Sequence, residues 1–127
     1  MGEFPNDAGV VSLAARWYAR AREQAARDGA PAQLVADVAE LGELTARIEA
    51  LSALPSPDPQ PDGSDIVVRY ERGAGLQDLN ARVADIMTRS AEDPAEAEVW
   101  RQIAADQRDA AALARQAAAI VADAAPE

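Results

Sequence analysis

The sequence lacks three residue types on which much enzyme chemistry depends. It has no cysteine and no histidine, and all 12 of its positive charges are arginines. The missing histidine removes the base that titrates near neutral pH, and the missing cysteine removes thiolate nucleophiles, disulfides and ordinary zinc sites. The missing lysine removes Schiff bases and the lysine of phosphate-binding loops. A carboxylate-held Mg²⁺ is the common catalytic device that remains, and we expect a protein that is not an enzyme and has no metal or cofactor.

Large apolar side chains are also scarce. Of 127 residues, 32 are alanine and only 30 are Ile, Leu, Val, Met, Phe, Trp or Tyr. One domain of this length is ordinary, but a monomer with so few large side chains has a thin core. We therefore expect the chain to associate with itself, most simply as a dimer, or with a partner.

Acidic charge predominates, with a formal net charge of −10 at pH 7. This charge repels nucleic acid and anionic membranes, and it favours a protein partner with a basic or apolar surface. No apolar run approaches the roughly 20 residues that span a bilayer, and the first residues lack the pattern of a secretory signal. Together with the absence of cysteine, these features predict a cytoplasmic protein that does not enter a membrane.

Apolar periodicity predicts four helices. Helices over 8–28 and from Pro31 to about Leu54 are separated by so few residues that they must form an antiparallel hairpin. A second hairpin is predicted from helices over about 76–90 and 94–124, the latter marked by a capping Asp93 before Pro94. The fold class is therefore all-α, with two helical hairpins.

A proline-rich segment and a strand-like segment separate the two hairpins. Residues 55–65 contain four prolines and predict an extended, mobile linker between units 1–54 and 66–127, although the two units could also pack as one domain. Residues 66–72, IVVRYER, alternate in polarity like a strand, and a Gly-Ala-Gly sequence at 73–75 ends the pattern. A lone strand needs a partner, so we expect it to pair with its symmetry mate in a dimer.

Several side chains are candidates for an interface. Aromatic residues on the edge of an apolar stripe can anchor a partner, a strand can pair across a dimer, and an alanine-lined helix invites close contact. The candidates are Tyr18, Ile66, Val68, Tyr70, Trp100, Ala110 and Ala117.

Two aspartates lie within apolar helical stripes, namely Asp37 and Asp106. A buried carboxylate needs a partner. One interpretation is a metal or acid site in the bundle, and the others are an Asp–Arg pair that fixes the helix register or a position that is not buried. Across the first hairpin, Arg20 is expected to face Glu40 as a seam ion pair.

Two local patterns resemble known families. The segment 40–44, Glu-Leu-Gly-Glu-Leu, resembles the paired acids of all-α nucleotide pyrophosphohydrolases of the MazG type, which would imply Mg²⁺-dependent hydrolysis through Glu40 and Glu43. The order strand, helix, turn, helix over Ile66 to about Ala112 resembles ribbon-helix-helix DNA-binding regulators, in which outward strand residues read bases. The outward residues here would be Val67, Arg69 and Glu71, and Glu71 would repel phosphate.

We interpret the chain as a non-enzymatic, acidic, helical protein–protein interaction module, such as an adaptor, assembly factor or inhibitor. Composition also fits a phage-type scaffold or assembly chaperone. A DNA-binding antitoxin-like regulator and a Mg²⁺-dependent hydrolase are the further alternatives, and both depend on the resemblances above.

Overall fold

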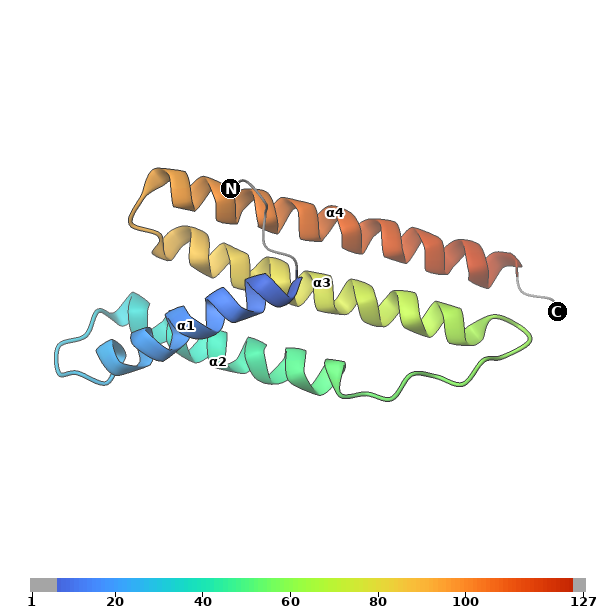
Figure 1. The fold of residues 1–127 in the computed structure, drawn as a ribbon, viewed down its shortest axis with the longest axis horizontal. Helices are drawn as coiled ribbons and strands as arrows, with labels where there is room; N and C mark the ends of the chain where they lie inside the picture. The colour runs from blue at the N-terminus through green and yellow to red at the C-terminus, as the bar shows by residue number, and fades with distance from the viewer. Residues whose placement is uncertain (1–6, 125–127) are drawn as a thin grey trace.

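The chain folds into four helices, as the sequence predicts (Figure 1). The computed structural model describes the backbone of residues 7–124 and the side chains of residues 16–124. The helices are α1 (Asp7–Ala25), α2 (Ala32–Ser52), α3 (Ser64–Ser90) and α4 (Pro94–Ala124). No strand occurs within residues 7–124. The all-α class is therefore confirmed.

The strand predicted at 66–72 is wrong, because these residues form the first turns of α3. Asp62 accepts a hydrogen bond from the Ser64 amide (3.0 Å), and Asp65 accepts one from the Gln60 amide (2.9 Å), so two carboxylates stabilise this helix start. The helix runs unbroken through Gly73–Gly75, although isolated glycines weaken helices. Gly75 has a packing role, because a Cβ there would lie 3.3 Å from Leu51 of α2.

The other helix boundaries follow local chemistry closely. Gly29 has a φ of 80°, which glycine tolerates, and it lies in the turn that follows α1. α2 begins just after Pro31. At the start of α4 the Asp93 carboxylate accepts a hydrogen bond from the Ala95 amide (2.8 Å), as the capping pattern predicts.

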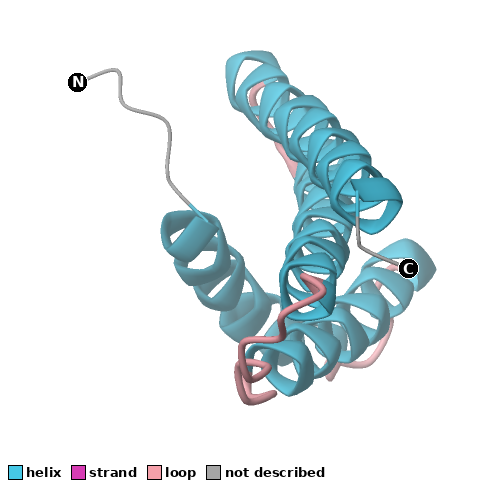
Figure 2. Cartoon of the chain, turned by 90° about the vertical axis from the view of Figure 1, so that its right-hand side faces the viewer, coloured by secondary structure: helices cyan, strands magenta, loops and turns pink. Residues whose placement is uncertain are grey.

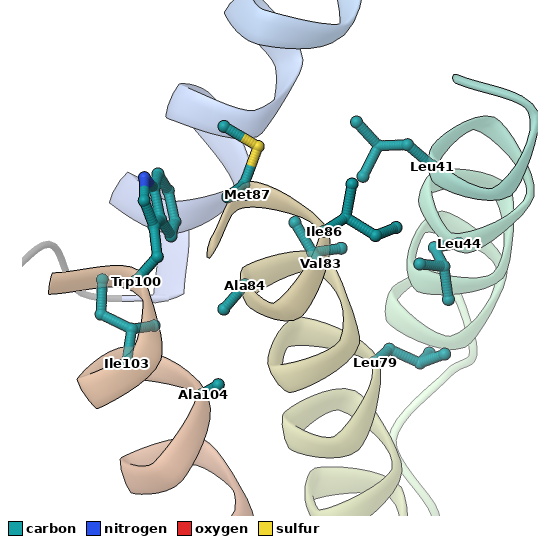
Figure 3. Close-up of a cluster of buried hydrophobic side chains, with 10 residues drawn as sticks. All are labelled: Leu41, Leu44, Leu79, Val83, Ala84, Ile86, Met87, Trp100, Ile103 and Ala104. Atoms are coloured by element: carbon teal, nitrogen blue, oxygen red, sulfur yellow. The ribbon is translucent and has the colours of Figure 1, made fainter. Parts of the chain in front are cut away.

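α3 is the central helix of the fold (Figures 1 and 2). It packs along α4 on one side and against α2 and α1 on others, whereas within the described residues α2 and α4 have no backbone contact. The core follows this order, with Leu41 and Leu44 of α2 beside Leu79 and Ile86 of α3 (Figure 3). On the far side of α3, the core continues with Val83, Ala84, Met87, Trp100, Ile103 and Ala104.

Alanines at seven-residue spacing make the α3–α4 contact close. Ala74 and Ala81 of α3 are fully buried, and Ala104, Ala111 and Ala118 of α4 are at most 4% exposed. A seven-residue repeat keeps one row of side chains on the partner helix, and alanine at that row lets the two backbones approach. α3 therefore packs on the row of Ala104, Ala111 and Ala118, and not on the stripe through Ala110 and Ala117 that the sequence indicated as the contact face of this helix.

The α3–α4 pair extends beyond the other helices. α2 ends at Ser52, near the middle of α3, as the contact between Leu51 and Gly75 shows (Figure 1). Residues 53–63 then continue along α3 towards its first residue. Arg72 donates a hydrogen bond to the Pro55 carbonyl (2.6 Å), and Arg69 donates one to the Pro57 carbonyl (3.5 Å). We call the part of the pair formed by residues 64–74 and 110–124 the free end.

Candidate functional site

Asp37 is the most deeply buried carboxylate of the described residues, at 3% exposure. It accepts hydrogen bonds from Arg89 Nη2 (2.6 Å), Gln33 Nε2 (2.8 Å) and Ser90 Oγ (3.5 Å). Gln33 lies one turn earlier on α2, and the other two donors end α3. The Asp–Arg pair that the sequence offered as one interpretation is thus present, and it ties the start of α2 to the end of α3.

Five further charged residues connect to Asp37, and together they form a charge network across three helices. Glu40 accepts two hydrogen bonds from Arg82 (2.5 and 2.9 Å) and lies 3.7 Å from Arg89. Arg82 lies 3.9 Å from Asp85, which accepts two hydrogen bonds from Arg108 of α4. Glu40 therefore pairs with Arg82 of α3 and not, as expected, with Arg20 of α1.

The charge network is electrically neutral, with three arginines and three carboxylates. The hydrogen bond from Arg82 to Glu40 raises the pKa of Arg82, and that from Arg108 to Asp85 raises the pKa of Arg108. Bidentate geometry favours arginine at such positions. This chemistry aligns helices, and it leaves both Glu40 oxygens engaged by a guanidinium.

The hydrolase resemblance lacks the site geometry that it implies. Glu40 is held by Arg82 at the seam between α2 and α3, while Glu43 is exposed to solvent. Within residues 16–124, no group of three or more carboxylates is placed to share a metal ion.

Comparison with known proteins adds no assignment. No family model, curated protein or solved structure matches this chain. Within the described residues, no helix has both the length and the hydrophobicity that crossing a membrane requires.

Asp106 was a candidate for a buried carboxylate, and of the interpretations offered for it the structure supports a position that is not buried. It is exposed and accepts a hydrogen bond from Gln102 Nε2 (2.9 Å) on its own helix. The helical wheel placed it correctly on an apolar stripe of α4, but α3 packs on a different stripe.

Two aromatic candidates for an interface lie at the core instead. Trp100 is 5% exposed within the core cluster, and Tyr18 is half-buried against that cluster. The Tyr18 hydroxyl lies 2.7 Å from the point where a Cβ on Gly42 would be, and the guanidinium of Arg22 lies 5.5 Å from the Tyr18 ring centroid. Both aromatic residues contribute to packing within the chain.

Four other candidates lie on the two helices of the free end. Ile66 and Tyr70 of α3 are 43% and 40% exposed, and Ala110 and Ala117 of α4 are half-buried. Two exposed ion pairs, Arg108–Asp85 and Arg115–Asp78, close the opposite side of the helix pair. Because each residue advances about 100° around a helix, Ala110 and Ala117 lie roughly 160° from Arg108 and Arg115 on α4. Ile66 is likewise roughly 120° from Asp78 on α3.

Two residues that were not among the interface candidates lie on the same stripe of α4 as Ala110 and Ala117. Leu113 and Ile120 of α4 are 65% and 68% exposed, the highest values among the large apolar residues described. They lie seven residues apart and next to Ala110 and Ala117 on the helix surface. We call the α4 residues Ala110, Leu113, Ala117 and Ile120 the apolar face.

The remaining candidate, Val68, is half-buried on the other side of α3. It is separated from Ile66 by roughly 160° around α3, so Val68 and Ile66 lie on different sides of this helix. The ribbon-helix-helix interpretation also required 66–72 to be a strand that pairs across a dimer, and these residues are helical. That resemblance therefore loses its structural basis.

Proposed function

We propose that the protein is a non-enzymatic protein–protein interaction module that binds its partner through the apolar face. The observation that carries the proposal is a second heptad series on α4. Soluble proteins gain nothing from a long exposed apolar stripe unless something covers it.

The first heptad series of α4 is used within the chain. Its positions alternate by four and three residues, and all of them are buried or half-buried against the fold: Trp100, Ala104, Gln107, Ala111, Ala114, Ala118 and Val121. This spacing is that of a helix packed along another helix.

The second series has the same spacing and lies partly in solvent. It consists of Ile103, Asp106, Ala110, Leu113, Ala117, Ile120 and Ala124. Ile103 is buried in the core, while Leu113 and Ile120 are largely exposed. A helix that carries two such series is typical of a bundle with a helix on each side. The described chain supplies only one of these neighbours along the free end.

The grounds for self-association are narrower than the sequence suggested. Residues 66–72 are helical, so they have no unpaired strand ladder, and the alanines that α4 packs against α3 are Ala104, Ala111 and Ala118. What remains is the apolar face, which a second copy or a different protein could cover. A dimer would be concentration-dependent, and sedimentation from about 1 to 500 μM would reveal it.

The proposal is tested by replacing Leu113 and Ile120 together with glutamine. Because both side chains are largely exposed, the substitutions should change the free energy of unfolding by less than about 0.5 kcal/mol. They should remove proteins that co-purify with the wild-type chain from its native host. Val35→Gln is the matched control, since Val35 is 45% exposed on α2. Partners that bind both variants equally well would contradict the proposal.

A further inference from the structure

We infer that the apolar face receives an amphipathic helix whose flanks are basic. This inference rests on the function proposed above and specifies its partner. The heptad spacing of the apolar residues on α4 favours a helix as the partner. The charges around these residues determine which charge the flanks of that helix should carry.

The arginines near the free end are already engaged. Arg69 and Arg72 donate to carbonyls of residues 53–63, while Arg108 and Arg115 pair with Asp85 and Asp78. The contacts of Arg108 and Arg115 hold their guanidinium groups on the side of the helix pair that is away from the apolar face.

The carboxylates of α4 near the apolar face are not engaged in this way. Asp106, Asp109 and Asp123 are all exposed, and none of them has an ion pair with another described residue. Asp106 belongs to the exposed heptad series, and the other two directly precede Ala110 and Ala124 of that series. An approaching helix therefore meets apolar side chains bordered by uncompensated negative charge, which favours lysine or arginine on its flanks.

A second copy fits this surface less well than a basic helix does. Pairing two copies of α4 along the series would bring Asp106, Asp109 and Asp123 of each copy towards the same residues of the other. Like charges in register destabilise helix pairs and suppress association. The net charge of −10 on each chain adds a repulsion of longer range.

The test uses two synthetic helical peptides of about 21 residues, which is three heptads. Both carry alternating alanine and leucine at the seam positions. One has lysine and arginine at the flanking positions, and the other has glutamate there. Each is titrated against the full chain by fluorescence anisotropy at 150 mM salt. The chain variants are Leu113→Gln with Ile120→Gln, the control Val35→Gln, and a third variant with Asp106, Asp109 and Asp123 all changed to asparagine.

The basic peptide should bind the wild-type chain at least about tenfold more tightly than the acidic peptide. Leu113→Gln with Ile120→Gln should weaken that binding by about tenfold or more, while Val35→Gln should leave it unchanged. The asparagine variant should reduce the difference between the two peptides.

Equal binding of both peptides that still requires Leu113 and Ile120 would overturn the inference about charge and leave the proposed function standing. If the basic peptide binds the variant with Leu113→Gln and Ile120→Gln as tightly as it binds the wild type, the binding is general electrostatic attraction. That result would contradict both the inference and the proposed function. Failure of both peptides to bind would overturn the inference. A dimer that dissociates on Leu113→Gln with Ile120→Gln would instead identify a second copy as the occupant, and would likewise overturn it.

Discussion

Removing either partner of the Asp37–Arg89 pair should destabilise the fold, but by different amounts. The Asp37 side chain is 5% exposed and the Arg89 side chain is 40% exposed. Removing the arginine strands a carboxylate away from water, whereas removing the carboxylate leaves an arginine that can turn to solvent. The structure therefore predicts an asymmetry between the two substitutions.

The size of each effect follows from the contacts that remain. Arg89→Met leaves Asp37 with only the neutral donors Gln33 and Ser90, so the cost should be about 3 kcal/mol, the lower end for stranding a buried charge. Asp37→Asn keeps a polar group for these donors and leaves Arg89 within 3.7 Å of Glu40. Its cost should be about 1 kcal/mol, that of one hydrogen bond.

Urea denaturation followed by circular dichroism measures both costs, and the double variant completes a thermodynamic cycle. Arg115→Met is the control, because its pair with Asp78 has side chains 53% and 46% exposed. That substitution should leave the free energy of unfolding almost unchanged, because an exposed ion pair contributes little. If Arg89→Met costs no more than the control, or less than Asp37→Asn, the argument from burial is refuted.

Three further predictions concern packing and pH. Gly42→Ala should destabilise the wild-type chain by about 1 kcal/mol, because the new Cβ would lie 2.7 Å from the Tyr18 hydroxyl. In a Tyr18→Phe background the same substitution should stabilise the chain, because alanine favours a helix more than glycine does. Thermal unfolding of the wild type, the two single variants and the double variant checks this. Ala81→Val should lower the free energy of unfolding by about 1–3 kcal/mol, because Ala81 is fully buried. Ala119→Val should lower it by less than about 1 kcal/mol, because Ala119 is exposed, and urea titration distinguishes the two effects. The hydrogen bond from the Ser64 backbone amide lowers the pKa of Asp62 below 3.8. The ionised Asp62 carboxylate therefore stabilises the fold above that pH, and this stabilisation is lost as the pH falls through the lowered pKa. The difference in melting temperature between the wild type and Asp62→Asn should vanish in acid.

The helix hairpins were predictable because their signals are local. Asp93 before Pro94 marks a helix start through one hydrogen bond and one fixed dihedral angle, and the structure has both the cap and the boundary. Gly29 and Pro31 likewise mark the turn after α1. Such signals need no knowledge of the neighbouring helices.

The state of residues 66–72 was not predictable from their own pattern. β-branched residues and alternating polarity favour a strand, but seven residues are too few to separate that pattern from one face of a helix. The decisive interactions come from outside the segment, where Asp62 and Gln60 contact the helix start, and from the long contact with α4. Tertiary context therefore outweighs local propensity here.

The two aspartates show the same limit for the candidate site. Both lie on apolar stripes of their helices, but a wheel does not say which stripe another helix covers. The central position of α3 settles the matter, since it brings Arg89 against Asp37 and leaves Asp106 on the uncovered series of α4. Leu113 and Ile120 share one stripe with Ala110 and Ala117 in the printed sequence, but the sequence does not show that α3 leaves this stripe uncovered.

The arrangement around α3 explains why the uncovered surface lies on α4. α3 has α4, α2, α1 and residues 53–63 around it, so most of its length is buried or half-buried. α4 contacts α3 as its main neighbour, and alanine fills that seam, so its larger side chains at Leu113 and Ile120 project elsewhere. Small residues in the internal seam and large residues on the outer series divide the two roles of the helix. The first role holds the fold together, and the second, under the proposed function, is to bind a partner.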